Sequence, residues 1–183
     1  MWYNASIVHR ERQVVNVDKY FRVSKNIRKA NIDDIQRIAE ILVFSKRKNY
    51  RHIFNDDIGS FVDLQVCPLA KEYIENPELL DNMFVYDDGF VKGIITVDGL
   101  LIKELYVEPF FEGKGIGGQL IEFAKAEFNS CQLWVLDENE KAKAFYKQHG
   151  FHQTKETQLV PEVPNSGILE RKMIRDVTVV ANT

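Results

Sequence analysis

The chain has 183 residues, of which 45% are hydrophobic and 28% are charged, with 10 glycines and 5 prolines. This length corresponds to about one domain of roughly 150 residues, and the composition excludes disordered, collagen-like and low-complexity chains. The net charge of −3 argues against a dedicated nucleic-acid-binding protein, which is usually strongly basic. The charge is unevenly spread, because residues 1–30 carry a balance of +5, which leaves −8 for the rest of the chain.

The cysteine count and the lengths of the apolar runs indicate the cellular compartment of the protein. Cys67 and Cys131 form no CxxC pair, so neither a disulfide framework nor a zinc knuckle is indicated. Residues 1–8 contain no apolar run of signal-peptide length, and no stretch approaches the 18 apolar residues of a membrane span. The four histidines form no recognisable metal-binding pattern. We therefore expect a cytoplasmic protein with no metal, no nucleic-acid partner and no membrane contact.

The first part of the chain predicts an extension followed by a strand and a helix. Residues 1–21 are interpreted as an N-terminal extension, and residues 21–27 have strand-like character. Apolar residues then recur at helical spacing, which predicts an amphipathic helix over 31–45 with Asn31 as its cap. Residues 46–80 carry weaker signals, with helical character over 69–74.

A three-stranded antiparallel meander is predicted next. Its strands cover 83–86, 90–97 and 100–107. The connections contain Asp88-Gly89 and Asp98-Gly99, and Asp-Gly between apolar runs favours a hairpin because glycine accepts the positive φ of a type I′ turn.

The remaining elements alternate helices and strands. Helices are predicted over 116–129 and from the Asn139 cap to the Gly150 stop, with a strand over 132–136 between them. Two further strands are predicted over 151–160 and 168–174. The expected organisation is one domain over 22–175 and a C-terminal tail over 176–183.

The glycine loop at 113–118 joins a strand to a helix, which is a place that suits phosphate groups. It lacks the Gly-Lys-Ser/Thr of a Walker A loop but fits GxGxxG, and Asp137 lies 19 residues after Gly118, where a ribose-binding acid would be expected. A nicotinamide-dinucleotide-binding oxidoreductase is therefore one alternative. The antiparallel meander before the loop and the short remainder after Asp137 argue against it.

The loop also resembles another family, the GNAT superfamily of acyl-CoA-dependent N-acetyltransferases, whose phosphate loop is Gln/Arg-x-x-Gly-x-Gly/Ala. The stretch 105–117 fits this pattern, with Glu112 where the family usually has Gln or Arg. A second stretch, Asn139-x-x-Ala142-x-x-Phe145-Tyr146-x-x-x-Gly150-Phe151, resembles the family's second cofactor-binding block. The resemblance implies an α/β (α+β) fold, with a mixed, mostly antiparallel sheet of about seven strands flanked by helices.

The resemblance implies acetyl-CoA as the acyl donor and assigns its contacts. In the family, the strand before the loop pairs with the pantetheine arm, and the loop amides hold the pyrophosphate. Glu112 brings a negative charge there, so weaker binding through the amides is expected. The implied cofactor contacts are Leu105, Tyr106, Val107, Glu112, Gly113, Lys114, Gly115, Ile116, Gly117, Gly118, Asn139, Ala142 and Tyr146.

The implied chemistry is direct transfer of an acetyl group to a primary amine in a ternary complex. The amine must lose a proton and the leaving sulfur must gain one. Tyr146 resembles the family's tyrosine acid, and Glu104 occupies a strand position where some relatives carry a carboxylate base. Tyr50 and His52 are candidates for the acceptor pocket.

The acceptor is expected to be an amine on a small molecule or a peptide, and a homodimer is retained as a candidate assembly. A second alternative is a non-catalytic acyl-CoA-binding sensor on the same fold. It would bind CoA without turning over any amine.

Overall fold

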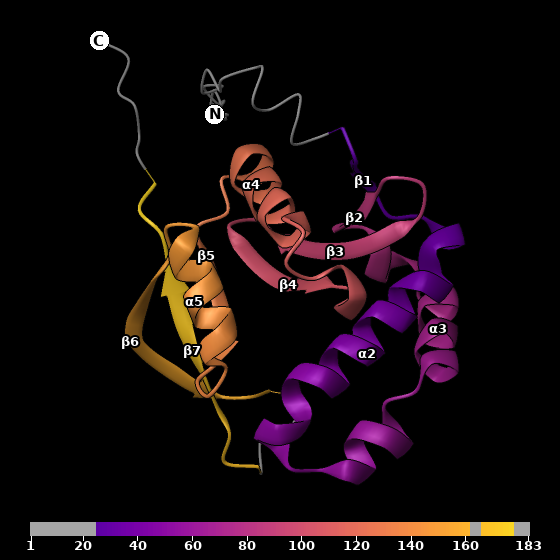
Figure 1. Cartoon of the computed structure of the whole chain (residues 1–183), viewed down its shortest axis with the longest axis horizontal. Helices are drawn as coiled ribbons and strands as arrows, with labels where there is room; N and C mark the ends of the chain where they lie inside the picture. The colour runs from indigo at the N-terminus through magenta and orange to yellow at the C-terminus, as the bar shows by residue number, and fades with distance from the viewer. Residues whose placement is uncertain (1–24, 162–165, 178–183) are drawn as a thin grey trace, which may run out of the picture.

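The strands expected between residues 83 and 107 form a meander at the centre of a larger sheet (Figure 1). The computed structural model describes residues 25–161 and 166–177, and within these ranges the sheet has seven strands in the order β1-β2-β3-β4-β5-β7-β6. Every neighbouring pair is antiparallel except β4 with β5. The mixed, mostly antiparallel sheet expected from the sequence is therefore confirmed. The strands are β1 (Ile27–Lys29), β2 (Met83–Asp87), β3 (Val91–Asp98), β4 (Leu101–Val107), β5 (Gln132–Leu136), β6 (His152–Leu159) and β7 (Leu169–Ile174).

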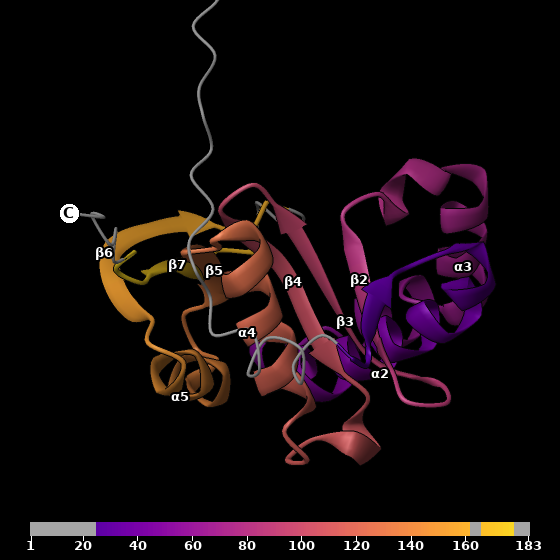
Figure 2. The same ribbon diagram turned by 90° about the horizontal axis from the view of Figure 1, so that it is seen from above.

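Helices cover both faces of the sheet. The α-helices are α2 (Ile35–Phe54), α3 (Val66–Glu75), α4 (Ile116–Phe128) and α5 (Glu140–Gln148). Ile94 packs in the core under α2 and α3, whereas its neighbour Ile95 packs in the core under α4 and α5, because successive strand residues point to opposite faces. Figure 2 shows β3 and β4 between α4 and α2.

The sheet opens between β4 and β5, and this opening positions the functional site. The two strands pair only at Leu101 with Gln132 and at Ile102 with Leu133. Farther along, β4 stays paired with β3 up to Val107, while β5 stays paired with β7. Among the described residues, the edge of β4 that faces β5 therefore has no strand partner beyond Ile102. Backbone groups along such an edge are available to a ligand.

Two predicted elements differ from the observed ones. The helix expected over 31–45 begins with a 3₁₀ turn at Ile32–Asp34 and continues as α2 to Phe54, nine residues beyond the predicted end. The weak helical signal over 69–74 corresponds to the longer α3. Most of the strand expected over 21–27 and the extension over 1–21 lie outside the described residues.

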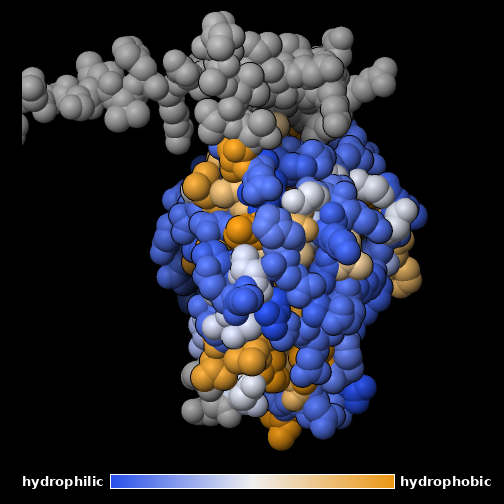
Figure 3. All heavy atoms as spheres, turned by 90° about the vertical axis from the view of Figure 1, so that its left-hand side faces the viewer, coloured by the Kyte–Doolittle hydropathy of each residue, from blue (hydrophilic) through white to orange (hydrophobic). Residues whose placement is uncertain are grey.

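Strand β6 is the edge strand of the sheet on the side shown in Figure 3. The surface on this side is mainly hydrophilic, with smaller hydrophobic areas. Most of the side chains of β6 are exposed. Among the residues that the structure describes, no helix has both the length and the apolar character needed to cross a membrane.

Candidate active site

Two cavities meet in the opening between β4 and β5. One, of about 440 Å³, lies along the glycine loop, α4 and α5. The other, of about 590 Å³, lies between α2, the segment after α2, β4 and β5. We call them the loop cavity and the α2 cavity. The residues that line both cavities, and so mark their junction, are Asn49, Leu105, Tyr106, Asn139, Ala142 and Tyr146.

The glycine loop presents the first turn of α4 to the loop cavity. Gly113 and Gly115 have φ values of +73° and +81°, a conformation that other residues rarely adopt. Gly115 caps α4 without a side-chain hydrogen bond, and no side chain in the described ranges bonds to the N–H groups of the first turn. Such amides at the positive end of a helix dipole suit a phosphate group. The loop therefore fits the diphosphate of a CoA ligand.

The structure brings nearly all of the expected cofactor contacts to this cavity. The exception is Lys114, which is exposed and whose Nζ lies 4.7 Å from the ring centre of Phe111. The expected contacts that line the cavity are Leu105, Tyr106, Val107, Glu112, Gly113, Gly115, Ile116, Gly117, Gly118, Asn139, Ala142 and Tyr146.

Glu112, the residue that departs from the usual family pattern, is held by two lysines. Its Oε2 atom lies 2.9 Å from the Nζ of Lys48 on α2 and 2.6 Å from the Nζ of Lys141 on α5. Burial alone would raise the pKa of Glu112, but the hydrogen bonds from Lys141 and Lys48 outweigh it and lower that pKa. The carboxylate is thus ionised at neutral pH, and the two ammonium groups offset its charge at the loop cavity.

Tyr146 lies at the junction of the two cavities. Asn139 accepts a hydrogen bond from the Ala142 amide at 3.0 Å, which caps α5 and sets the register of the helix that carries Tyr146. The tyrosine ring packs edge-on against Phe145 and Phe151. Burial, with a smaller effect of Tyr50, raises the pKa of the phenol, so it remains a proton donor at neutral pH.

Two side chains on one face of β4, Glu104 and Tyr106, contact residues of α2. Glu104 lies 3.7 Å from the Nζ of Lys46 and accepts a hydrogen bond from Thr96 at 3.3 Å. The hydroxyl groups of Tyr106 and Tyr50 are 3.0 Å apart. Burial, with smaller effects of Tyr50 and Glu104, raises the pKa of Tyr106, so this phenol is also protonated at neutral pH. The alternation of β4 therefore places the expected base on the side of the α2 cavity.

The two candidates for the acceptor pocket occupy different places. Tyr50 lines the α2 cavity, whereas His52 is exposed and lines neither cavity. Both residues belong to α2, which continues past the predicted end of the helix, so they lie on different sides of one helix. Glu104 and Trp134 face the α2 cavity from β4 and β5.

Sequence reasoning missed His149, which lines the loop cavity. Its ring lies 4.7 Å from that of Phe145, its Nδ1 lies 3.1 Å from Glu122, and its Cε1 would be 3.2 Å from a Cβ placed on Gly118. The helical spacing of Phe145 and His149 was the signal that could have found this contact. Gly118 therefore serves the close approach of α4 to His149.

Asp137, the residue that supported a dinucleotide-binding alternative, is already engaged. It accepts hydrogen bonds of 2.6 and 2.9 Å from Arg171, and Lys143 lies 3.7 Å away. The glycine loop also follows an antiparallel meander and not a parallel βαβ unit. Both observations argue against the oxidoreductase alternative. No group of three or more His, Cys, Asp and Glu side chains in the described ranges is placed to hold a metal ion.

Comparison with known proteins shows which proteins the chain is similar to. Residues 80–153 match the family model of the acetyltransferase (GNAT) domain. An uncharacterized N-acetyltransferase of Lactobacillus delbrueckii subsp. lactis is 34% identical over 84 residues, which are 37% of this chain and 49% of that protein. The chain thus spans about half the length of that relative. The spermidine N(1)-acetyltransferase of Thermoplasma acidophilum is 27% identical over 143 residues, which are 70% of this chain and 89% of that protein.

A solved structure agrees with the fold. The PaiA N-acetyltransferase of Thermoplasma acidophilum, in complex with coenzyme A, has a TM-score of 0.57 at 19% identity and covers 80% of this chain and 96% of its own. Residues 80–153 are thus similar to the acetyltransferase (GNAT) domain, and the solved structure shares the fold. The matching family model is that of acetyltransferases, and the similar solved structure has coenzyme A bound.

Proposed function

We propose that the protein is an N-acetyltransferase that transfers the acetyl group of acetyl-CoA to a primary amine by direct attack in a ternary complex. The observation that carries this proposal is the junction of the two cavities at Tyr146. A thioester in the loop cavity and an amine in the α2 cavity can meet there. The six shared lining residues include no cysteine or serine that would carry the acyl group in between.

The cofactor arm is proposed to follow the open edge of β4. The backbone groups of Leu105 to Val107 on the edge of β4 that faces β5 would bind the pantetheine amides, and the N–H groups of the first turn of α4 would bind the diphosphate. Acetyl-CoA supplies an activated acetyl thioester at the junction. The protein contributes position and proton transfer, which are the roles its own residues can fill.

The two protons of the reaction are assigned to separate groups. The amine nitrogen forms the new bond to the acetyl carbon as the carbon–sulfur bond breaks. Tyr146 donates a proton to the leaving sulfur, and Glu104 accepts the amine proton directly or through a water molecule. Glu104 lines the α2 cavity and Tyr146 lines both, so the acid and the base approach the junction from different elements.

The lining of the α2 cavity favours a cationic acceptor. Four carboxylates line it, against two lysines, and one of these lysines, Lys103, is paired at 3.3 Å with Asp98, which is not part of the lining. Aromatic and aliphatic side chains supply the apolar walls. Spermidine, the acceptor in the name of a relative, is therefore the first amine to test, beside a lysine peptide. The carboxylates are Asp56, Asp63, Glu104 and Glu170.

Acetyl-CoA at about 100 times its dissociation constant should stabilise the fold by roughly 2.7 kcal/mol and raise Tm by about 5–10 °C. Thermal unfolding with acetyl-CoA, CoA and NADH measures this shift, and thiol release over a panel of amines measures turnover. A shift with NADH but not with CoA would contradict the proposal. A shift with CoA and no release with any amine would instead support the sensor alternative.

Replacing Glu112 by glutamine should tighten acetyl-CoA binding by about 3- to 10-fold, because it frees two ammonium groups beside the proposed diphosphate site. The dependence of the dissociation constant on salt should become steeper as well. Titration calorimetry at low and high ionic strength measures both effects. Glu75→Gln, which removes the same charge from an exposed pair with Lys71 on α3, is the control. Unchanged binding in Glu112→Gln would mean that the lysines do not reach the ligand.

A further inference from the structure

The outer wall of the α2 cavity is formed by a short segment with little core packing of its own. Gly59, Ser60 and Asp63 line the cavity from a single helical turn, η2 (Gly59–Asp63), and Leu64, which ends this turn, lines it as well. No residue of this turn is buried. Backbone bonds from the Ser60 amide to Asp56 and from the Leu64 amide to Gly59 close the turn on itself. These bonds do not fix its position against the cavity.

Arg47 on α2 joins this turn to the body of the domain. Its Nε donates a hydrogen bond to the Ser60 carbonyl at 2.8 Å, and its Nη2 donates one to the Leu64 carbonyl at 2.6 Å. The guanidinium also lies 5.3 Å from the ring centre of Phe61, a residue that lies between Ser60 and Leu64 in the chain. The side chain of Arg47 therefore contacts the turn near its start, at Phe61 and just after its end.

The position of Arg47 on α2 explains why it acts on the wall and not on a ligand. Tyr50 and Phe54 follow it at helical spacing and line the cavity, whereas Arg47 does not. Arg47 and the two aromatic residues thus approach the same segment from one helix. The two hydrogen bonds of Arg47 thus connect residues 59–64 to the helix that carries Tyr50 and Phe54.

The guanidinium is suited to this task in a way that an ammonium is not. Its planar fork presents several N–H donors in fixed directions, so that two carbonyls four residues apart are bound at once. Arg51 provides the contrast within the same helix. Its guanidinium lies 5.7 Å from the ring centre of Phe61, but it donates hydrogen bonds of 2.7 and 3.2 Å to the side chain of Asp57, which precedes the turn.

We propose that Arg47 is a positioning residue that fixes residues 59–64 as the outer wall of the acceptor pocket and so sets the affinity for the amine. This inference rests on the proposed function for the role of the cavity, but not for the role of the arginine. Ser60 and Asp63 of this wall line the same cavity as residues of β4 and β5. A wall that is free to move would bind the amine less well and would leave the junction at Tyr146 unchanged.

The first test measures the wall without any activity. In Arg47→Lys, amide hydrogen exchange over residues 58–66 should be about tenfold faster than in the wild type, because local opening becomes easier. Exchange in β3, β4 and α4 should be unchanged. Arg51→Lys, the matched control, should exchange within about twofold of the wild type throughout. Equal exchange over 58–66 in Arg47→Lys and the wild type would overturn the proposal.

The second test separates the acceptor from the donor, with spermidine as the probe. In Arg47→Lys, KM for spermidine should rise about tenfold, while kcat and KM for acetyl-CoA stay within about twofold. A fall in kcat at constant KM, or an equal rise in both KM values, would contradict a role limited to the wall. If the wild type acetylates neither spermidine nor any amine of the panel, the proposed function fails, and the exchange experiment alone decides the role of Arg47.

Discussion

Tyr146→Phe should lower kcat about a hundredfold, because a positioned general acid typically contributes that much or more. The dissociation constant of acetyl-CoA should change by less than about threefold, since the ring of Tyr146 packs in the core and phenylalanine keeps that packing. Steady-state kinetics with spermidine and calorimetry with acetyl-CoA measure the two quantities. Equal losses in turnover and in acetyl-CoA binding would show that the hydroxyl is structural.

The pH dependence of kcat tests the role of Tyr146 independently. Burial raises the pKa of Tyr146 above the usual value of a tyrosine, which is about 10. The acid form therefore persists over the whole working range, and kcat should show no decline from this group below about pH 10. A decline centred near neutral pH that disappears in Tyr146→Phe would assign the titration to this side chain and contradict its environment.

Tyr73→Phe is the matched control for the loss of a buried hydroxyl. Tyr73 lies in α3, packs in the core under α2, and has a pKa that burial raises, as for Tyr146. It lines neither of the two cavities. This variant should keep kcat within about twofold of the wild type. A similar loss of kcat in both variants would indicate a general effect on the fold.

The sequence predicts the strands of this fold well because their signals are local. Asp98-Gly99 separates two apolar runs, and Gly99 adopts a φ of +56° in the turn between β3 and β4. The strand predicted over 132–136 has the observed bounds of β5. A glycine loop after a strand also predicts the loop cavity, because glycine content and element order can be read without tertiary contacts.

The α2 cavity is less accessible to sequence reasoning because long-range contacts build it. The polar stretch after residue 45 hides the continuation of α2, which ends in the structure at Asn55 in a left-handed conformation. Arg47 bonds backbone carbonyls 13 and 17 positions away. Every residue has a backbone carbonyl, so the sequence does not show which ones accept these hydrogen bonds. Glu112 is recognisable as a departure from a pattern, but its two lysines come from α2 and α5 and need the fold to be found.

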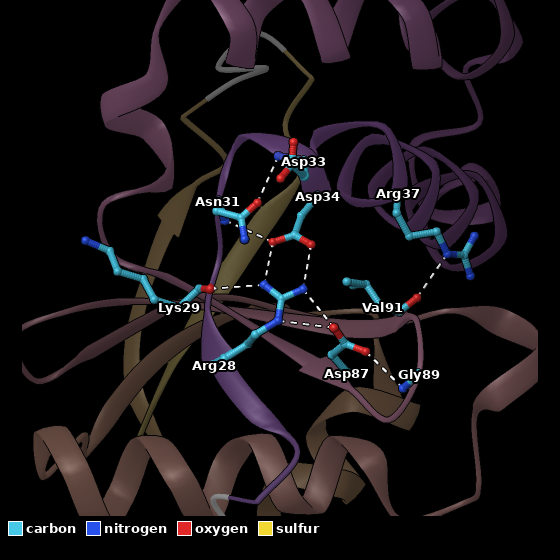
Figure 4. Close-up of polar contacts among 9 residues, drawn as sticks. All are labelled: Arg28, Lys29, Asn31, Asp33, Asp34, Arg37, Asp87, Gly89 and Val91. Atoms are coloured by element: carbon cyan, nitrogen blue, oxygen red, sulfur yellow. Dashed lines mark hydrogen bonds and ion pairs between the residues drawn. The ribbon is translucent and has the colours of Figure 1, made fainter.

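The second large effect is expected at an ion-pair network that joins β1, the turn before α2, and β2. Arg28 donates two hydrogen bonds of 2.7 Å to Asp34 and two, of 2.8 and 3.1 Å, to Asp87, and Figure 4 shows its guanidinium between the two carboxylates. The Asn31 amide also donates to Asp34 at 2.9 Å. The side chain of Asp34 is only 7% exposed, so its charge depends on these partners.

Arg28→Met should lower the free energy of unfolding at pH 7 by about 2–4 kcal/mol, because it leaves the buried carboxylate of Asp34 without its cation. We expect a loss of stability near the lower end of what is typical for broken buried ion pairs, because the side chain of Arg28 is 40% exposed. Urea unfolding measures the change. Arg51→Met, which removes the exposed pair with Asp57, is the control and should change the stability little. An equal loss in both variants would contradict a special role of the network.

The same network should make the stability depend on pH with a definite sign. Burial alone would raise the pKa of Asp34, but the hydrogen bonds from Arg28 and the Asn31 amide outweigh it and lower that pKa. Arg28 and the Gly89 amide lower the pKa of Asp87. Carboxyl groups with a lowered pKa in the folded state stabilise it above their unfolded pKa of about 3.9, and this stabilisation is lost as the pH falls through the folded value.

The difference in stability between the wild type and Arg28→Met should therefore be largest above about pH 5 and should shrink below about pH 3. Urea unfolding of both proteins at several pH values between these limits measures it. A difference that stays constant with pH would instead assign the effect to the packing of the aliphatic part of Arg28, because packing does not titrate. The pH dependence thus separates the charge of Arg28 from its contact area.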